Sequence, residues 1–493
     1  MRALISTLPR RIGLSIGVML LAAALMLIFT MHEYWLNPEQ LTIGQMMKRL
    51  VMLPGLIALA LFLSGTFAAQ RAAAATPAQG VRSAVTHDRA GKPFLVQVVG
   101  LEWLNPLQRR DYPTEWQTLW TMGLVKPNRN DDMVRKEPKS FTSVMPVAGI
   151  ADGNNGTNTL KGFHMQYVEQ LLLLFGDRYA MNPNYFYSVA ASDKHRWREL
   201  AGIHVEYAFP AGRLDPVEVG TYLREQIIRN FDIGNRSFPD LWSKDTPPDV
   251  HVTPGGPNAG FTSLNAALDY LQSHPAESVW VMNWDAPSFP PKDMQMNENM
   301  ALLILAGPQM DTGRDPLAWI GRAATANVDD FEAKAGTTRM TQAWKAAIDT
   351  AAQNAGINAS HINYVIHDAG RGSDAASERV AALGRSLTET LQEFDFQKQT
   401  FNTPALLGEM GAGTALTDVV LAIGRANHLG GHILVAGTTD PKHPTAVVVT
   451  PPAKLIPIDP DKDWFRARGE NNAYLPWWGR RRGVSYPTQG YTE

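Results

Sequence analysis

The chain has 493 residues, 45% of them hydrophobic, and a formal net charge of −2 at pH 7. This length exceeds a single small core, so two or more packed units are expected. The near-zero charge argues against a nucleic-acid binder, which needs clustered positive charge to neutralise phosphates. The chain has no cysteine, which excludes disulfides, thiolate zinc sites and a cysteine nucleophile.

The first 75 residues are predicted to be a membrane anchor. Residues 12–31 and 50–69 carry no charge, and each would form a helix of about 30 Å, long enough to cross a bilayer. Basic residues are more frequent before the first segment and after the second than between them. This bias favours a hairpin with both ends in the cytoplasm. The alternative is a signal peptide cleaved in the alanine-rich region 67–75, which would place the rest in the periplasm.

After a linker over residues 76–92, apolar strands alternate with amphipathic helices, which predicts a layered α/β fold. We expect a helix at 116–122 and an irregular insertion at 126–158. Thr262 or Ser263 is expected to cap the helix after the turn TPGGPNAG. In chain order, strands are expected at 94–104, 204–212, 249–253, 278–287, 300–305, 362–367, 431–439 and 445–451, and the other helices at 162–177, 216–230, 262–273, 341–355, 373–393 and 415–426.

The similar order of elements in two parts of the chain predicts an internal duplication, although no sequence repeat is visible. The expected halves are residues 93–335, which include the insertion, and residues 336–450. Residues 451–493 contain WFRARGE and PWWGRRRG. They form an aromatic and basic extension, which covers the surface or contacts a membrane or partner.

Five polar positions could carry chemistry. His367 ends the strand NYVIH and could act as a general base or an oxyanion donor, or be a satisfied structural histidine. Asp285 follows an apolar strand, where it could be a catalytic acid or cap a turn. Glu409 could be a base, and Asp374 and Glu378 could bind a metal or form a solvated helix face. His361 and Trp284 are weaker candidates.

Two glycine-rich turns precede helices: TPGGPNAG at 253–260 and GEMGAG at 408–413. Glycines at such turns let the backbone approach a ligand or allow close packing. Neither turn contains the lysine of a phosphate-binding loop.

Several segments between residues 94 and 449 resemble the thiolase-like fold of ketoacyl synthases. VVGLEWLNPL is similar to the opening strand of that family, GPNAGFTSLNAALDYL to its nucleophile corner, and NYVIHDAGRGSDAASE and GEMGAGTALTDVVLAI to its two histidine motifs. The resemblance places Gly260 where the cysteine nucleophile would stand. His367 matches the first histidine, Glu409 replaces the second, and the lysine before that motif is absent from NTPALLGEM.

The runs TPGGPNAGFTSLNAALDYL and SVWVMNWDAPSFP, after a membrane-associated N-terminus, resemble the family of type VI secretion lipase adaptors. This resemblance implies a non-enzymatic protein that binds a lipase effector and helps load it onto the secretion spike. It carries no site residues. The expected location is the bacterial inner membrane, with the soluble part in the cytoplasm or, alternatively, in the periplasm.

The sequence leaves three alternative functions for the protein. The favoured one is the adaptor, a pseudoenzyme without cofactor or metal on a degenerate thiolase-like scaffold. The rival is an acyltransferase or hydrolase that uses His367 with Glu409 or Asp285, and it predicts an open polar pocket joining these side chains. The third is a membrane-anchored scaffold without cargo selectivity.

Overall fold

The computed structural model describes residues 93–104, 122–124, 159–175, 203–230, 248–286, 299–312, 315–370, 372–391 and 393–457. The predicted membrane hairpin, the linker, the insertion and most of the C-terminal extension lie outside these residues, and so does nearly all of the helix expected at 116–122. Within the described part of the chain, no helix is both long enough and apolar enough to cross a membrane.

The strands form one mixed sheet of 11 strands with the order β3-β2-β4-β5-β1-β6-β11-β10-β8-β9, and the short β7 pairs with β11. The first five strands are β1 (Val96–Leu104), β2 (His204–Pro210), β3 (Asp249–Gly255), β4 (Ser278–Asp285) and β5 (Asn299–Ala306). The others are β6 (Ala318–Ile320), β7 (Ala324–Thr325), β8 (Ile362–His367), β9 (Thr400–Asn402), β10 (His432–Gly437) and β11 (Thr445–Thr450).

The helices of the first half are α6 (Leu160–Phe175), α7 (Pro216–Asn230) and α8 (Ala259–Ser273). Those of the second half are α9 (Arg339–Asn354), α10 (Asp374–Thr390), α11 (Thr403–Leu407) and α12 (Thr414–Leu429). Three short 3-10 turns occur in the second half: η6 (Val328–Asp330), η7 (Ala359–His361) and η8 (Gly411–Gly413).

The expected internal duplication is confirmed by the topology. In the first half β2 is parallel to β3 and β4, while β5 is antiparallel to β4 and β1. In the second half β8 is parallel to β9 and β10, while β11 is antiparallel to β10 and β6. Strands β1 and β6, in the middle of the sheet, pair antiparallel and join the halves. The second half thus begins at Ala318, before the expected boundary at residue 336.

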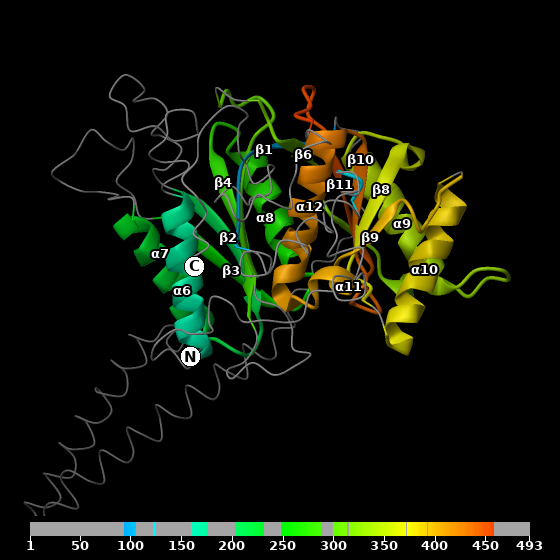
Figure 1. Ribbon diagram of the computed structural model, residues 1–493, viewed down its shortest axis with the longest axis horizontal. Coiled ribbons are helices and arrows are strands. Elements are labelled where there is room, and N and C mark those ends of the chain that lie inside the picture. Colours follow the sequence, from blue (N-terminus) through cyan, green and yellow to red (C-terminus); the bar gives the residue numbers. More distant parts are fainter. Residues whose placement is uncertain are drawn as a thin grey trace, which may run out of the picture. The chain divides into compact units, whose positions relative to one another are not determined.

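The helices form three layers around the sheet (Figure 1). Helices α6 and α7 cover the outer face of the first half, and α9 and α10 cover that of the second. Helices α8 and α12 lie between the two halves and contact each other. The equivalent helices α8 and α12 are therefore the central layer of the fold.

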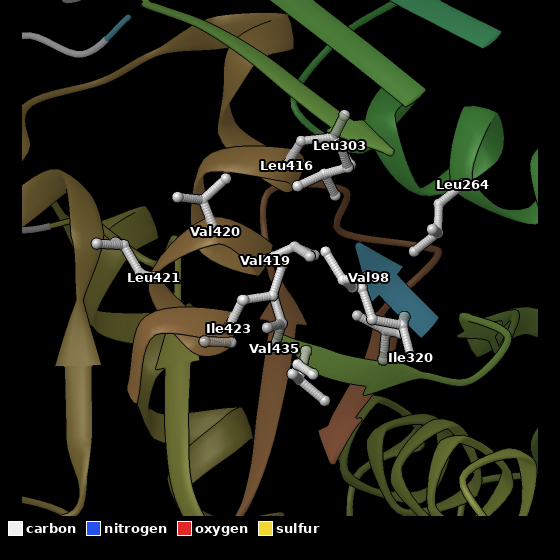
Figure 2. Packing of buried hydrophobic residues seen from close by; sticks show 14 of the residues in the cluster. Val98, Leu264, Leu303, Ile320, Leu416, Val419, Val420, Leu421, Ile423 and Val435 are labelled. Carbon is white, nitrogen blue, oxygen red and sulfur yellow. The ribbon is translucent and has the colours of Figure 1, made fainter. Parts of the chain in front are cut away.

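Alternate residues of each strand supply different cores, as the period of two requires. Val279 and Val281 of β4 join the central core, whereas Trp280 and Met282 join the outer core of the first half. In the central core, Leu264 of α8 and several leucine and valine residues of α12 pack against the strands (Figure 2). This apolar contact on both faces explains why β4, β5 and β1 are fully buried.

The start of α8 differs from the expectation. The helix begins at Ala259, three residues earlier than predicted, and its N-cap is Asn258, which makes no side-chain capping hydrogen bond. The prediction of Thr262 or Ser263 as the cap is therefore wrong, since both lie inside the helix. The reason is that the first turn packs against α12 and β10, and this tertiary contact outweighs the local capping preference.

Candidate functional site

Three of the predicted site residues, Gly260, Asp285 and Glu409, lie at one segment, residues 408–416, which contains η8 and the start of α12. Asp285 contacts its Ala412, and Gly260 lies against Ala415 and Leu416. Gly437, at the end of β10, lies against Asn258 and Phe261, which belong to the corner between β3 and α8. His367 ends β8 beside Ala436 of β10. The structure thus brings together the corner, the histidine and the glycine-rich turn.

Gly260 is required by the contact between the two central helices. A Cβ atom built at this position would lie 3.0 Å from the Ala415 Cβ atom and 3.1 Å from the Leu416 Cγ atom. The Leu416 backbone nitrogen would be 3.3 Å away. The space that a nucleophilic side chain would occupy is therefore filled by α12.

Replacing Gly260 with alanine is expected to destabilise the protein by about 1–3 kcal/mol, because overpacking forces neighbouring groups apart. Gly260→Cys should cost more and should not form a covalent adduct with an acyl-thioester, since the thiol has no room to be presented. Urea unfolding measures the first effect, and intact mass after incubation with acyl-CoA measures the second. Gly256→Ala is the matched control, because no atom lies within 4 Å of a Cβ there. A stable Cys variant that is acylated would contradict this explanation.

Asp285 is fully committed to hydrogen bonds within the protein. Its Oδ1 atom accepts from Arg213 Nη1 at 2.9 Å and from the backbone N–H of Ala286 at 2.8 Å. Its Oδ2 atom accepts from the backbone N–H of Ala412 at 2.9 Å. Burial raises the pKa of Asp285 to about 6, although these three donors each oppose the rise. The carboxylate holds the glycine-rich turn to β4.

Two asparagines support the same turn. The Nδ2 atoms of Asn283 and Asn299 donate to the carbonyl oxygen of Gly413 at 2.7 and 3.0 Å. A Cβ atom at Gly413 would collide with the Asn299 side chain. The GEMGAG turn is therefore a structural link between the halves, in which glycine permits the close approach of β5.

His367 is buried, with 1% of its surface exposed. Its Nδ1 atom accepts a hydrogen bond from the Ala369 N–H at 3.3 Å, so the proton of the neutral ring lies on Nε2. That Nε2 atom is buried without a hydrogen-bond partner among the described residues. Burial lowers the pKa of His367 to about 4. This tautomer can donate to an oxygen but cannot accept a proton at Nε2.

Glu409 is exposed, and it interacts electrostatically with the buried carboxylates of Asp368 and Asp418. Partial desolvation first, and then the charge of Asp368, raise the pKa of Glu409, and Arg379 lowers it. The pKa of Asp418 is also raised, by burial and by the charges of Asp368 and Glu409. Asp368 itself accepts from the N–H and hydroxyl of Thr438, at 2.5 and 2.7 Å. Three acidic groups with one nearby arginine resist ionisation together.

The remaining candidates lie away from this region or are explained by packing. Asp374 and Glu378 are exposed in the first turns of α10, where negative charge is favoured. His361 is exposed at the opposite end of β8 from His367. Trp284 is fully buried in the outer core of the first half.

Sequence reasoning missed Asp368, Asp418, Asn283 and Asn299. A local signal existed for two of them: Asn283 lies in an otherwise apolar strand, and Asp418 in an apolar helix. A polar residue in such a place is buried and needs a partner. Their partners lie far away in the sequence, so the pattern alone could not name them.

Covalent acyl transfer requires an activated nucleophile next to a base and an oxyanion donor. Among the described residues, the buried Nε2 atom of His367 could donate to an oxyanion, whereas Asp285 is held by its hydrogen bonds to Arg213, Ala286 and Ala412.

The second half matches a known family. Residues 317–451 match the model of the family described as type VI lipase adapter protein Tla3, C-terminal. This half of the chain is therefore similar to type VI lipase adapters. The matched residues run from just before β6 to just after β11, so they coincide with the second repeat of the fold. No curated protein sequence matches the chain.

Solved structures similar to the chain include ketosynthases. The oxazolomycin ketosynthase domain OzmH of Streptomyces albus has a TM-score of 0.46 and 12% identity, over 75% of this chain and 99% of its own. The module 6 ketosynthase of the Bacillus subtilis bacillaene synthase has a TM-score of 0.47 and 10% identity, over 76% and 75%. OleA of Xanthomonas campestris has a TM-score of 0.39 and 9% identity, over 73% and 100%. Similarity at this level carries no inference about activity.

Proposed function

We propose that the protein is a non-enzymatic adaptor that binds a lipase effector and helps load it onto a type VI secretion spike. The observation that carries this proposal is the family match, which covers the whole second repeat. A complete structural unit, rather than a short motif, is therefore similar to the lipase adapters.

The geometry around the corner between β3 and α8 supports the same proposal. Gly260 touches α12, Asp285 binds the GEMGAG turn, and His367 is buried. Gly260 and Asp285 are accounted for by these contacts, whereas the buried Nε2 atom of His367 has no hydrogen-bond partner among the described residues. In this proposal the corner has a structural role, because the fold needs a sharp turn between a strand and the central helix α8. The protein would then be a pseudoenzyme.

The proposal also places the protein at the inner membrane. The uncharged segments 12–31 and 50–69 would anchor it, and their flanking charges favour a cytoplasmic position for the folded part. An adaptor in that position would meet its lipase before export, in the cell that produces it.

Affinity purification of the full chain from cells with a type VI system, followed by mass spectrometry, tests the proposal. We expect a lipase to co-purify in near-equal amounts with the wild type and with His367→Ala, because His367 is buried and cannot touch a cargo. The parallel assay is acyl-CoA turnover. Loss of turnover in the variant, with no lipase recovered from either protein, would support an acyltransferase or hydrolase instead.

A further inference from the structure

Four ionisable side chains form a compact array at the start of strands β2 and β3. The strands begin with His204-Val-Glu206 and Asp249-Val-His251. In the parallel register His204 lies opposite Asp249, and Glu206 lies opposite His251. Because side chains alternate along a strand, all four project from the same face of the sheet. This face is covered in part by α8, whose Tyr270 stacks on the His204 ring at 3.8 Å.

Three atoms of the array face one another. The Asp249 Oδ2 atom lies 3.1 Å from His204 Nδ1 and 2.9 Å from His251 Nε2. One ligand atom from each of the three residues lies within 4.8 Å of those from the others. Four ligands around zinc at 2.0–2.2 Å are spaced about 3.3 Å apart in a tetrahedron. The two distances from the Asp249 Oδ2 atom are therefore close to the spacing that one ion requires.

Both ring nitrogens of His204 face a carboxylate oxygen, and a neutral ring cannot donate a hydrogen bond to both. Its Nε2 atom lies 2.8 Å from Glu206 Oε1, and its Nδ1 atom faces Asp249. A neutral imidazole has a single N–H, so it can satisfy only one of the two carboxylates. A metal ion at Nδ1 would use the lone pair of that atom, while the Nε2–H group donates to Glu206.

The surroundings of His204 favour a bound metal ion. Glu206 is buried, and its contact with Nε2 leaves Nδ1 as the coordinating atom, the arrangement in which a carboxylate orients a metal-binding histidine. His204 is 5% exposed and cannot turn away, whereas Asp249 and His251 are exposed and leave the remaining position open to water. From α8, Tyr270 donates its hydroxyl hydrogen to Glu277 at 2.6 Å, so it does not compete for Asp249.

We propose that His204, Asp249 and His251 form a binding site for one zinc ion or a similar divalent transition-metal ion, with Glu206 as the residue that positions His204. Two ligands come from β3, which is the edge strand of the sheet, and one comes from the buried strand β2. The ion would tie the edge strand to the core of the first half. This inference is independent of the proposed adaptor function.

Equilibrium dialysis of the untagged full chain against Zn²⁺, with the bound metal measured by mass spectrometry, tests the site. We expect the wild type to bind one zinc ion per chain more than His251→Ala. Glu206→Gln should keep the site but weaken it about 10–100-fold, the usual cost of removing a residue that orients a ligand. Cobalt substitution should give the intense visible bands of a four-coordinate ion in the wild type and lose them in His251→Ala.

The control is His443→Ala, which removes an exposed histidine whose Nδ1 atom lies 3.0 Å from Asp440, a similar pair without a third ligand. This variant should bind zinc like the wild type. Asp249→Asn provides a second ligand variant, since its exposed side chain can change without disturbing the core. Zinc binding that is absent from the wild type, or equal in the wild type, His251→Ala and Asp249→Asn, would overturn the proposal.

Discussion

Replacing Asp285 with alanine is expected to lower the free energy of unfolding by about 3–5 kcal/mol, the cost of breaking a buried ion pair. The variant leaves the guanidinium of Arg213 without its carboxylate and the Ala412 N–H without its acceptor. Ala412 belongs to the second repeat, and Asp285 belongs to β4 of the first. The loss of this hydrogen bond should therefore loosen the contact between the two halves. The midpoint of urea unfolding, followed by tryptophan fluorescence, measures the effect.

Two further variants separate this structural role from catalysis. Asp285→Asn keeps one acceptor oxygen and should cost less than Asp285→Ala. Asp269→Ala removes an exposed aspartate that contacts Arg322, and it should cost less than about 1 kcal/mol. If Asp285→Ala were as stable as the wild type, Asp285 would not hold the halves together, and a functional role for its carboxylate would have to be reconsidered.

Acidification from pH 6.5 to pH 4 is expected to destabilise the protein because it contains buried neutral histidines. Burial lowers the pKa of His164, His367 and His428 to about 4. In the unfolded chain these rings take up a proton near pH 6.5, so the unfolded state binds more protons between the two values. The stability from each neutral ring is present above pH 6.5 and falls by up to about 3 kcal/mol toward pH 4.

The variant His367→Asn isolates one of these contributions. Asparagine offers an acceptor to the Ala369 N–H but does not titrate. Its free energy of unfolding should therefore fall less steeply between pH 6.5 and pH 4 than that of the wild type. Asp285 opposes this trend in both proteins, because its raised pKa favours the folded state as the pH falls through 6. An unchanged slope in His367→Asn would contradict the burial of a neutral ring.

Much of the fold could be predicted because its elements are long and strongly patterned. The largely apolar β4 and β5 and the amphipathic α9 lie within a few residues of their predicted positions. The three-residue β6 was missed because it is too short to show a period of two. The boundary between the halves was consequently expected at residue 336 instead of before Ala318.

The candidate site could be predicted only in part. The motif around Gly260 lies in a segment that packs against the glycine-rich turn and the start of α12. The role of Asp285 could not be read from its neighbours, because its decisive partner Ala412 is 127 residues away. The array of His204 and Asp249 was missed for a related reason. The segments His-Val-Glu and Asp-Val-His form one cluster of side chains only because the topology places β2 beside β3.

Export of the lipase is the measurement that tests the central claim most directly. The lipase that co-purifies with the chain would be quantified in the medium of cells with and without the gene for this protein, with the spike protein measured in the same samples. The adaptor function predicts that loss of the gene abolishes lipase export while the spike is still secreted, and that His367→Ala restores export. Unchanged lipase export without the gene would contradict it.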